Sequence, residues 1–261
     1  MSIFKNGVAL DSLEAWEARA GPKSPDQWVD GRSAKETARA WLEAGAGNLP
    51  REVASVLEAH PDFGPLEIWE AEPEAKLPFD KFPGEPRNCD LVIFGQDRMG
   101  SVLIAVEAKA DEPFSETIGD TLAAALERKL KSSASNGIAR VEHLASALFG
   151  PRRKGEPSLK KIRYQLLTAC AGALCEAQRR DCNRALMLVQ EFVTTKTNDR
   201  KHVQNATDLN TFIKRISHGS VEALRAGEIV GPFEVPGMPL LSESPLLFVG
   251  KVSRNLRDSS A

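Results

Sequence analysis

Residues 87–114 read RNCDLVIFGQDRMGSVLIAVEAKADEPF, and this stretch decides the fold. Two apolar runs, 89–95 and 101–110, flank a short loop that ends in Gly100. Apolar runs on either side of a short glycine-containing loop are typical of a β-hairpin. The sequence therefore predicts two antiparallel strands here, and we expect the charged residues at their open end to carry the chemistry.

The hairpin brings acidic and basic side chains together. Glu107 and Lys109 are two residues apart in a strand, so both side chains leave the same face. If Gly95 pairs with residue 101 or 102, Asp90 lies opposite residue 106 or 107. Two carboxylates suit Mg²⁺, which prefers oxygen ligands, and a nearby lysine can orient water or neutralise phosphoryl charge. The alternative is a buried Glu107–Lys109 salt bridge, because the strand is otherwise apolar.

Outward from the hairpin, the chain alternates between helical and extended patterns. Expected helices and strands occur in this order: helices 33–44 and 51–60, strand 66–79, the hairpin, helices 117–133, 138–149 and 158–178, strand 185–193, helix 208–217 and strand 246–252. This order predicts an α/β protein with a mixed β-sheet flanked by helices. Three regions are expected: an irregular N-terminal arm (1–32), a core (33–217), and a C-terminal extension (218–261) with an extra strand and a polar tail.

Length and composition restrict the class of protein. The 261 residues include 34 Lys and Arg against 36 Asp and Glu, and no apolar run approaches the length of a membrane-spanning helix. Acidic residues occur early in the N-terminal stretch, which argues against a signal peptide, and the four cysteines show no disulfide spacing. We therefore expect a cytoplasmic protein with no membrane partner.

The residues of the hairpin and the order of elements resemble the PD-(D/E)xK nuclease superfamily. Asp90 heads one strand and Glu107-x-Lys109 ends the next, and the resemblance covers roughly 33–195. The segment VEAKADEPF is similar to uncharacterised bacterial members. The resemblance implies a restriction-endonuclease-like core and Mg²⁺- or Mn²⁺-dependent hydrolysis of nucleic acid, with DNA as the expected substrate. Asp90, Glu107 and the main-chain carbonyl of Ala108 would bind metal, and Lys109 would assist the attacking water.

Members of the superfamily often add a carboxylate from the first helix. Glu36 is the candidate here, with Glu43 second. Ser33 and Glu36 also have the spacing of a capping box, so helix capping is the alternative role. Some members carry Gln and Tyr four residues apart on a later helix, whereas Tyr164 and Gln165 are adjacent here.

A basic segment follows the hairpin. Residues 128–163 carry ten basic side chains against Glu142 and Glu156. Such a segment is either a phosphate-contacting surface or a solvated helix face and loop. The residues expected to seat a nucleic-acid backbone are Arg152, Arg153, Lys154, Lys160, Lys161, Arg163 and Gln165, an ordinary helix surface being the alternative for Gln165. Aromatic residues do not interleave with the basic ones, so stacking on single strands is not indicated and duplex DNA is expected.

The sequence contains a second Glu-x-Lys triplet. Glu74-Ala75-Lys76 repeats the Glu-x-Lys pattern without a preceding apolar hairpin, so we predict it exposed on the first strand and outside the site.

The alternative function is a catalytically inactive binding or assembly module, in a defence or toxin system, in which the Glu107–Lys109 ion pair is only a polar part of the core. A homodimer is among the assemblies that the resemblance allows.

Overall fold

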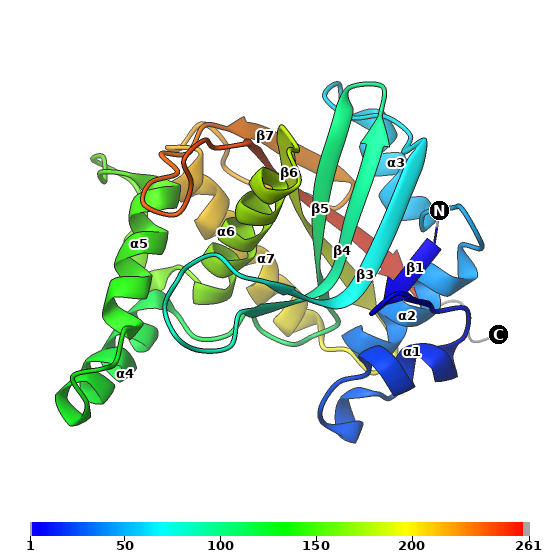
Figure 1. Cartoon of the computed structure of the whole chain (residues 1–261), viewed down its shortest axis with the longest axis horizontal. Coiled ribbons are helices and arrows are strands. Elements are labelled where there is room, and N and C mark those ends of the chain that lie inside the picture. Colours follow the sequence, from blue (N-terminus) through cyan, green and yellow to red (C-terminus); the bar gives the residue numbers. More distant parts are fainter. Residues whose placement is uncertain (1, 258–261) are drawn as a thin grey trace.

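The computed structural model describes residues 2–257, in which helices cover both faces of one mixed sheet (Figure 1). The strands are β1 (Ser2–Lys5), β2 (Val8–Ala9), β3 (Ile68–Leu77), β4 (Arg87–Asp97), β5 (Gly100–Lys109), β6 (Arg184–Val193), β7 (Glu228–Phe233) and β8 (Leu246–Asn255). Within the described residues they pair in the order β2-β1-β3-β4-β5-β6-β8-β7. β3, β4 and β5 form an antiparallel meander, whereas β5, β6 and β8 run parallel. The predicted α/β class with a mixed, helix-flanked sheet is confirmed.

The helices divide between the two faces of the sheet (Figure 1). One face is covered by α1 (Leu13–Ala20), α2 (Ser33–Glu43) and α3 (Arg51–Ala59). The other is covered by α4 (Ile118–Lys131), α5 (Gly137–Phe149), α6 (Tyr164–Arg179) and α7 (Asp199–Ile216). Two short 3₁₀ turns, Pro25–Gln27 and Leu159–Lys161, precede α2 and α6. Because β5 and β6 are buried on both faces, their sequences are continuous apolar runs rather than alternating ones.

The hairpin has the predicted register. Gly95 pairs with Val102 and Leu91 pairs with Val106, so Asp90 lies opposite Glu107. Helix α6 packs closely against the sheet beside the hairpin. A Cβ added to Gly172 of α6 would lie 3.1 Å from the Cβ of Leu77, so the glycine lets the helix approach the sheet closely.

The third strand changes face at Glu74. Before that residue, Trp69 and Ala71 pack on the side of α1–α3, whereas Ala75 and Leu77 after it pack on the side of α6. Side chains two residues apart in a regular strand share a face, so one residue between them must interrupt the alternation. Glu74 does so with a left-handed φ of 48°.

The neighbouring strand changes face at the same level. Ile93 and Leu91 pack on the side of α1–α3, and Cys89 packs on the side of α6. Pairing on both sides of this point aligns Glu74 with Asp90. The two carboxylates therefore sit side by side where both strands turn over.

The N-terminal residues are more ordered than the sequence predicts. β1 pairs in parallel with β3 at the edge of the sheet, and Trp16 and Trp28 are buried with the α1–α3 helices. Strand β7 is also unexpected, and α7 begins at Asp199 instead of near residue 208. The division into arm, core and extension stays a prediction, and residues 258–261 of the expected polar tail lie outside the described residues. None of the helices within 2–257 combines the length and apolar character that crossing a membrane requires.

Candidate active site at the open end of the hairpin

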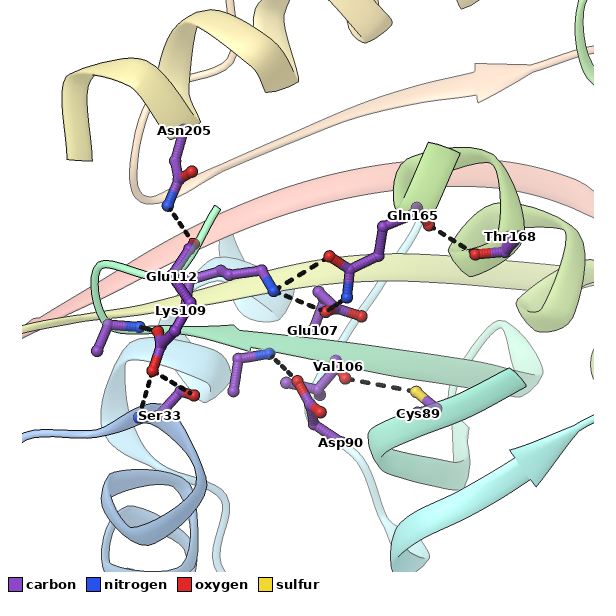
Figure 2. Close-up of polar contacts among 12 residues, drawn as sticks. Ser33, Cys89, Asp90, Val106, Glu107, Lys109, Glu112, Gln165, Thr168 and Asn205 are labelled. Atoms are coloured by element: carbon purple, nitrogen blue, oxygen red, sulfur yellow. Dashed lines mark hydrogen bonds and ion pairs between the residues drawn. The ribbon is translucent and has the colours of Figure 1, made fainter. Parts of the chain in front are cut away.

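Glu107 is the centre of the charged cluster. Its carboxylate is 3 % exposed and accepts a hydrogen bond from Arg87. It also accepts from Lys109 Nζ at 3.0 Å and from the amide of Gln165 (Figure 2). Burial by itself would raise the pKa of Glu107, but Arg87 and Lys109 outweigh it and hold the pKa below its usual value. The Glu107–Lys109 ion pair, which the sequence left open as the alternative to a metal site, is present, with Arg87 as a second cation that the sequence did not reveal.

Asp90 lies beside this cluster and forms no ion pair with any residue between 2 and 257. Its Oδ2 accepts the main-chain N–H of Ala108 at 2.7 Å (Figure 2). Burial and the neighbouring Glu107 raise the pKa of Asp90 to about 7, against the opposing effect of Lys109. The side chain is therefore an acid whose charge calls for a cation that the chain does not fully supply.

Glu74 is the acid that the sequence placed wrongly. It is half-buried, and it lines the same cleft as Asp90 and Glu107. Lys5 of β1 donates to the carbonyls of Pro73 and Glu74, both at 2.8 Å. These hydrogen bonds stabilise the backbone of β3 where the strand changes face. Burial raises the pKa of Glu74 to about 7, although Lys5 opposes it. The expectation that this triplet lies exposed and outside the site holds for Lys76, which is exposed, but is wrong for Glu74.

Lys109 is held by a side chain from another element. Gln165, in the first turn of α6, accepts from Lys109 Nζ at 3.2 Å through Oε1, while its amide donates to Glu107. Lys109 also lies over the ring of Phe114, 5.2 Å from the centroid. Two of the three ammonium protons are thus engaged, and one remains for a water or a ligand oxygen. The Gln165 side chain is therefore directed at the site and does not form part of an ordinary helix surface.

These residues line a cleft of about 360 Å³ between the sheet and the N-terminal segment. We call it the acidic cleft; its charged lining residues are Asp26, Arg32, Glu74, Asp90, Glu107, Lys109 and Glu112. The segment before α2 forms one wall through Trp16, Pro22 and Gln27. The expected arm is therefore part of the site.

The loop after β5 is held by hydrogen bonds to α2 and α7. The Glu112 carboxylate accepts from Ala110 N at 2.7 Å and from Ser33 Oγ at 3.2 Å. Asn205 of α7 donates to the Glu112 carbonyl at 2.8 Å (Figure 2). Such supports limit the motion of the strand end that carries Glu107 and Lys109.

Glu36 is not brought to this cluster. It is buried, accepts from Gly31 N at 2.7 Å and pairs with Arg39, and lines a separate cleft with Glu43 and Lys196. Its hydrogen bond to Gly31 satisfies a main-chain donor just before α2, which is a capping role. The capping box with Ser33 is absent, because Arg32 occupies the N-cap position and Ser33 begins the helix.

The basic residues predicted to seat nucleic acid fall into separate places. Arg163 pairs with Asp208 at 2.7 Å, and the exposed Lys160 and Lys161 lie in the turn against the start of α4. The exposed loop 152–154 is fastened through Glu156, which binds Arg215 and His218 at the end of α7.

The loop is far from the cluster along α7. The other end of that helix contacts the site, because Lys201 pairs with Asp111 at 3.4 Å. Fourteen residues of helix separate Lys201 from Arg215, on the order of 20 Å. Residues 152–154 therefore do not line the acidic cleft.

A divalent cation fits the donor set of the acidic cleft. Mg²⁺ is commonly held by one or two carboxylates together with water and substrate phosphates. Asp90, Glu107 and Ala108 line one cleft, and the raised pKa values of Asp90 and Glu74 reflect buried acids that a cation would satisfy. Within residues 2–257, however, no three His, Cys, Asp or Glu side chains converge as a preformed metal cluster. A cation would have to share Glu107 with Arg87 and Lys109.

The fold and the cluster together define an α/β protein with buried acids and a lysine where two central strands end. Residues 9–253 match the DUF6946 family, described as a domain of unknown function, and the chain belongs to this family. No curated protein and no solved structure matches the chain.

Proposed function

We propose that the protein is a metal-dependent nuclease with a restriction-endonuclease-like core that hydrolyses phosphodiester bonds, DNA being the expected substrate. One observation carries this proposal: Asp90, Glu107 and Lys109 come from adjacent antiparallel strands and line one cleft. Paired carboxylates beside a lysine suit reactions in which negative charge develops on a phosphoryl group.

The side chains have distinct proposed roles. Asp90 and Glu107 would hold Mg²⁺ or Mn²⁺ with the Ala108 carbonyl, and Glu74 would add negative charge beside them. The cation would supply Lewis-acid stabilisation of phosphoryl charge. Lys109 would direct its remaining proton at a water or phosphate oxygen, and Gln165 positions Lys109 for that role.

The substrate backbone would enter past exposed cations at the rim. Arg32 and Lys201 both pair with Asp111 and keep 43% and 55% of their side chains exposed. Each cation has further N–H donors that could face a phosphate while it stays paired with the buried Asp111. We propose these two residues, rather than loop 152–154, as the exposed cations at the rim of the acidic cleft.

A second candidate function rests on the pairing of Glu107. Arg87 and Lys109 neutralise this carboxylate from within the chain, as in a structural ion pair. This contact favours a non-catalytic binding or assembly module, in which the cluster only stabilises the sheet.

Cleavage assays with matched lysine variants separate the two functions. Wild type, Lys109→Met and Asp90→Asn are incubated with plasmid, linear DNA, single-stranded DNA and RNA in Mg²⁺ or Mn²⁺. Lys76→Met is the control, since it alters the exposed lysine of the second Glu-x-Lys triplet. We expect wild type and Lys76→Met to cleave alike, and Lys109→Met to be slower by about 10²- to 10⁴-fold.

Two results would overturn the nuclease proposal. One is cleavage by Lys109→Met at the wild-type rate, which would place the reaction elsewhere. The other is no cleavage of any substrate by wild type together with no rise in melting temperature on adding Mn²⁺. The second result would favour the non-catalytic module.

A further inference from the structure

A second cleft, of about 630 Å³, adjoins the acidic cleft. Lys109 and Gln165 line both clefts, so these two side chains form the wall between them. We call the second one the aromatic cleft; its characteristic residues are Phe79, Phe82, Arg87, Arg140, Tyr164 and Thr168. A ligand in the aromatic cleft would lie next to the lysine of the proposed reaction.

The two clefts differ in charge. Five carboxylates and two cations line the acidic cleft. Three cations (Arg87, Lys109 and Arg140) and two carboxylates (Asp80 and Glu85) line the aromatic cleft. The first therefore suits a cation. The cations of the second are already paired with Glu107 or Asp80, but their remaining N–H donors can face a phosphate beside the apolar surface of the cleft.

One wall of the aromatic cleft is formed by flat groups, with Phe82 next to Arg140 and backed by His143. The Phe82 ring lies 5.1 Å from the His143 ring, and the Arg140 guanidinium lies 5.9 Å from the Phe82 centroid. Asp80 accepts from Arg140 Nε at 2.6 Å and holds the guanidinium in place. Guanidinium planes and aromatic rings are the groups on which proteins stack unpaired bases.

Tyr164 supplies a second aromatic surface, directly before Gln165. The ring is half-buried, and its hydroxyl has no hydrogen-bond partner among residues 2–257. It is the one tyrosine of the sequence. An amphipathic ring with an unused hydroxyl suits a ligand that offers both a flat face and polar edges.

From this arrangement we infer that the aromatic cleft seats an unpaired nucleotide next to the phosphodiester held at the acidic cleft. The base lies against Tyr164 and the Phe82–Arg140 wall, and Arg140 and Lys109 face its phosphate. This inference rests on the proposed nuclease function and narrows its substrate to single strands, frayed ends or flipped nucleotides. The sequence points away from stacking because Arg140 and Tyr164 are far from Phe79 and Phe82 along the chain and meet them only in the fold.

Binding without catalysis tests the inference on the full chain. Fluorescein-labelled oligo(dT) and a blunt hairpin duplex of equal charge are titrated with protein in EDTA, and anisotropy gives the dissociation constants. We expect single strands to bind more tightly than the duplex. Tyr164→Leu and Phe82→Leu keep apolar bulk but remove the ring, and each should weaken single-strand binding about 5- to 100-fold.

Phe4→Leu is the matched control. Phe4 lines a different cleft, in which Arg180 lies over Phe94 much as Arg140 lies over Phe82. This variant should bind oligo(dT) like wild type. If Tyr164→Leu fails to fold by circular dichroism, Phe82→Leu and Arg140→Gln carry the same comparison.

A crosslink locates the base independently of the variants. Oligo(dT) containing 5-iodouracil is irradiated with wild-type protein, and the modified peptide is found by mass spectrometry. We expect the adduct at Tyr164. Equal single-strand affinity for wild type and both ring variants, or an adduct only outside the aromatic cleft, would overturn the inference.

Failure of the inference is distinguishable from failure of the nuclease proposal. Metal-dependent cleavage with no loss of affinity in the ring variants would leave the nuclease intact and reject the nucleotide seat. Ring-dependent binding without cleavage would keep the seat and reject catalysis. No binding of oligo(dT) by wild type at micromolar protein would reject the seat outright.

Discussion

The two ends of the β4–β5 hairpin hold buried charges that are matched in different ways. At the loop end, Asp97 and Arg184 are 0% and 4% exposed and form two hydrogen bonds, of 2.7 and 3.0 Å. At the open end, Glu107 is equally buried but contacts two cations and lies beside two further acids. One carboxylate meets one guanidinium at the first end, whereas at the second Arg87 and Lys109 pair with Glu107 and two further carboxylates, Asp90 and Glu74, line the same cleft.

This difference separates a structural ion pair from a candidate site. Asp97 also accepts the main-chain N–H groups of Gly64 and Met99, so its oxygens are satisfied within the chain. Asp90 and Glu74 instead have raised pKa values because burial leaves their charge incompletely balanced. At the loop end, the buried carboxylate is balanced by a guanidinium and only stabilises the fold. At the open end, acidic side chains are in excess, and a bound cation would balance them.

The largest expected effect is at the loop end. Arg184→Met leaves Asp97 buried and unpaired, which should lower the free energy of unfolding by about 3–5 kcal/mol. Urea denaturation followed by circular dichroism measures the loss. The double variant Asp97→Leu/Arg184→Met removes both charges and should regain most of it. A loss below about 1 kcal/mol in the single variant would show that the two ends are alike.

A smaller loss is expected from the equivalent change at the open end. Arg87→Met should cost about 1.5–3 kcal/mol, since Glu107 keeps its hydrogen bonds from Lys109 and Gln165. Arg87 also competes with a cation for Glu107, so the rise in melting temperature on adding Mn²⁺ should exceed that of wild type. The control is Arg163→Met, which breaks a partly buried pair with Asp208 away from the acidic cleft. An unchanged or smaller Mn²⁺ effect in Arg87→Met would contradict competition at Glu107.

The sequence predicts the part of this comparison that depends on local periodicity. The short loop and strands of period two place Asp90 opposite residue 106 or 107, and the observed pairing of Gly95 with Val102 selects Glu107. Lys109 follows from the same alternation. These residues are close in the chain, so short-range geometry is sufficient to bring them together.

The sequence does not predict what depends on a change of face or on distant segments. Regular alternation places Glu74 with Glu70 and Glu72 on a solvent face, and only its left-handed backbone turns it toward Asp90. Arg87 follows a Pro- and Gly-rich stretch that carries no periodic signal. The position of Glu36 on the first helix makes it a candidate, yet the side chain lines a different cleft from Asp90 and Glu107.

The pH dependence of stability tests whether Glu74 belongs with the buried acids at the open end of the hairpin. Burial raises the pKa of Glu74 from 4.5 to about 7, so the folded chain binds more protons than the unfolded chain between these values. The free energy of unfolding should therefore fall as pH rises through that window. Glu74→Gln should flatten the decline between pH 5 and pH 8, whereas the more exposed Glu72→Gln should not. Parallel curves for wild type and Glu74→Gln would remove Glu74 from the cluster.

The smallest effect is expected from the loop that the sequence singled out as basic. Arg152, Arg153 and Lys154 lie at the far end of α7, on the order of 20 Å from the contact of that helix with the site. At 0.15 M salt, charges this distant from a bound backbone are screened, because the Debye length is about 8 Å. Replacing all three by Gln should change the affinity for oligo(dT) by less than about twofold. Arg32→Gln, at the rim of the acidic cleft, should weaken it more, and the reverse order would show that nucleic acid crosses the other end of the molecule.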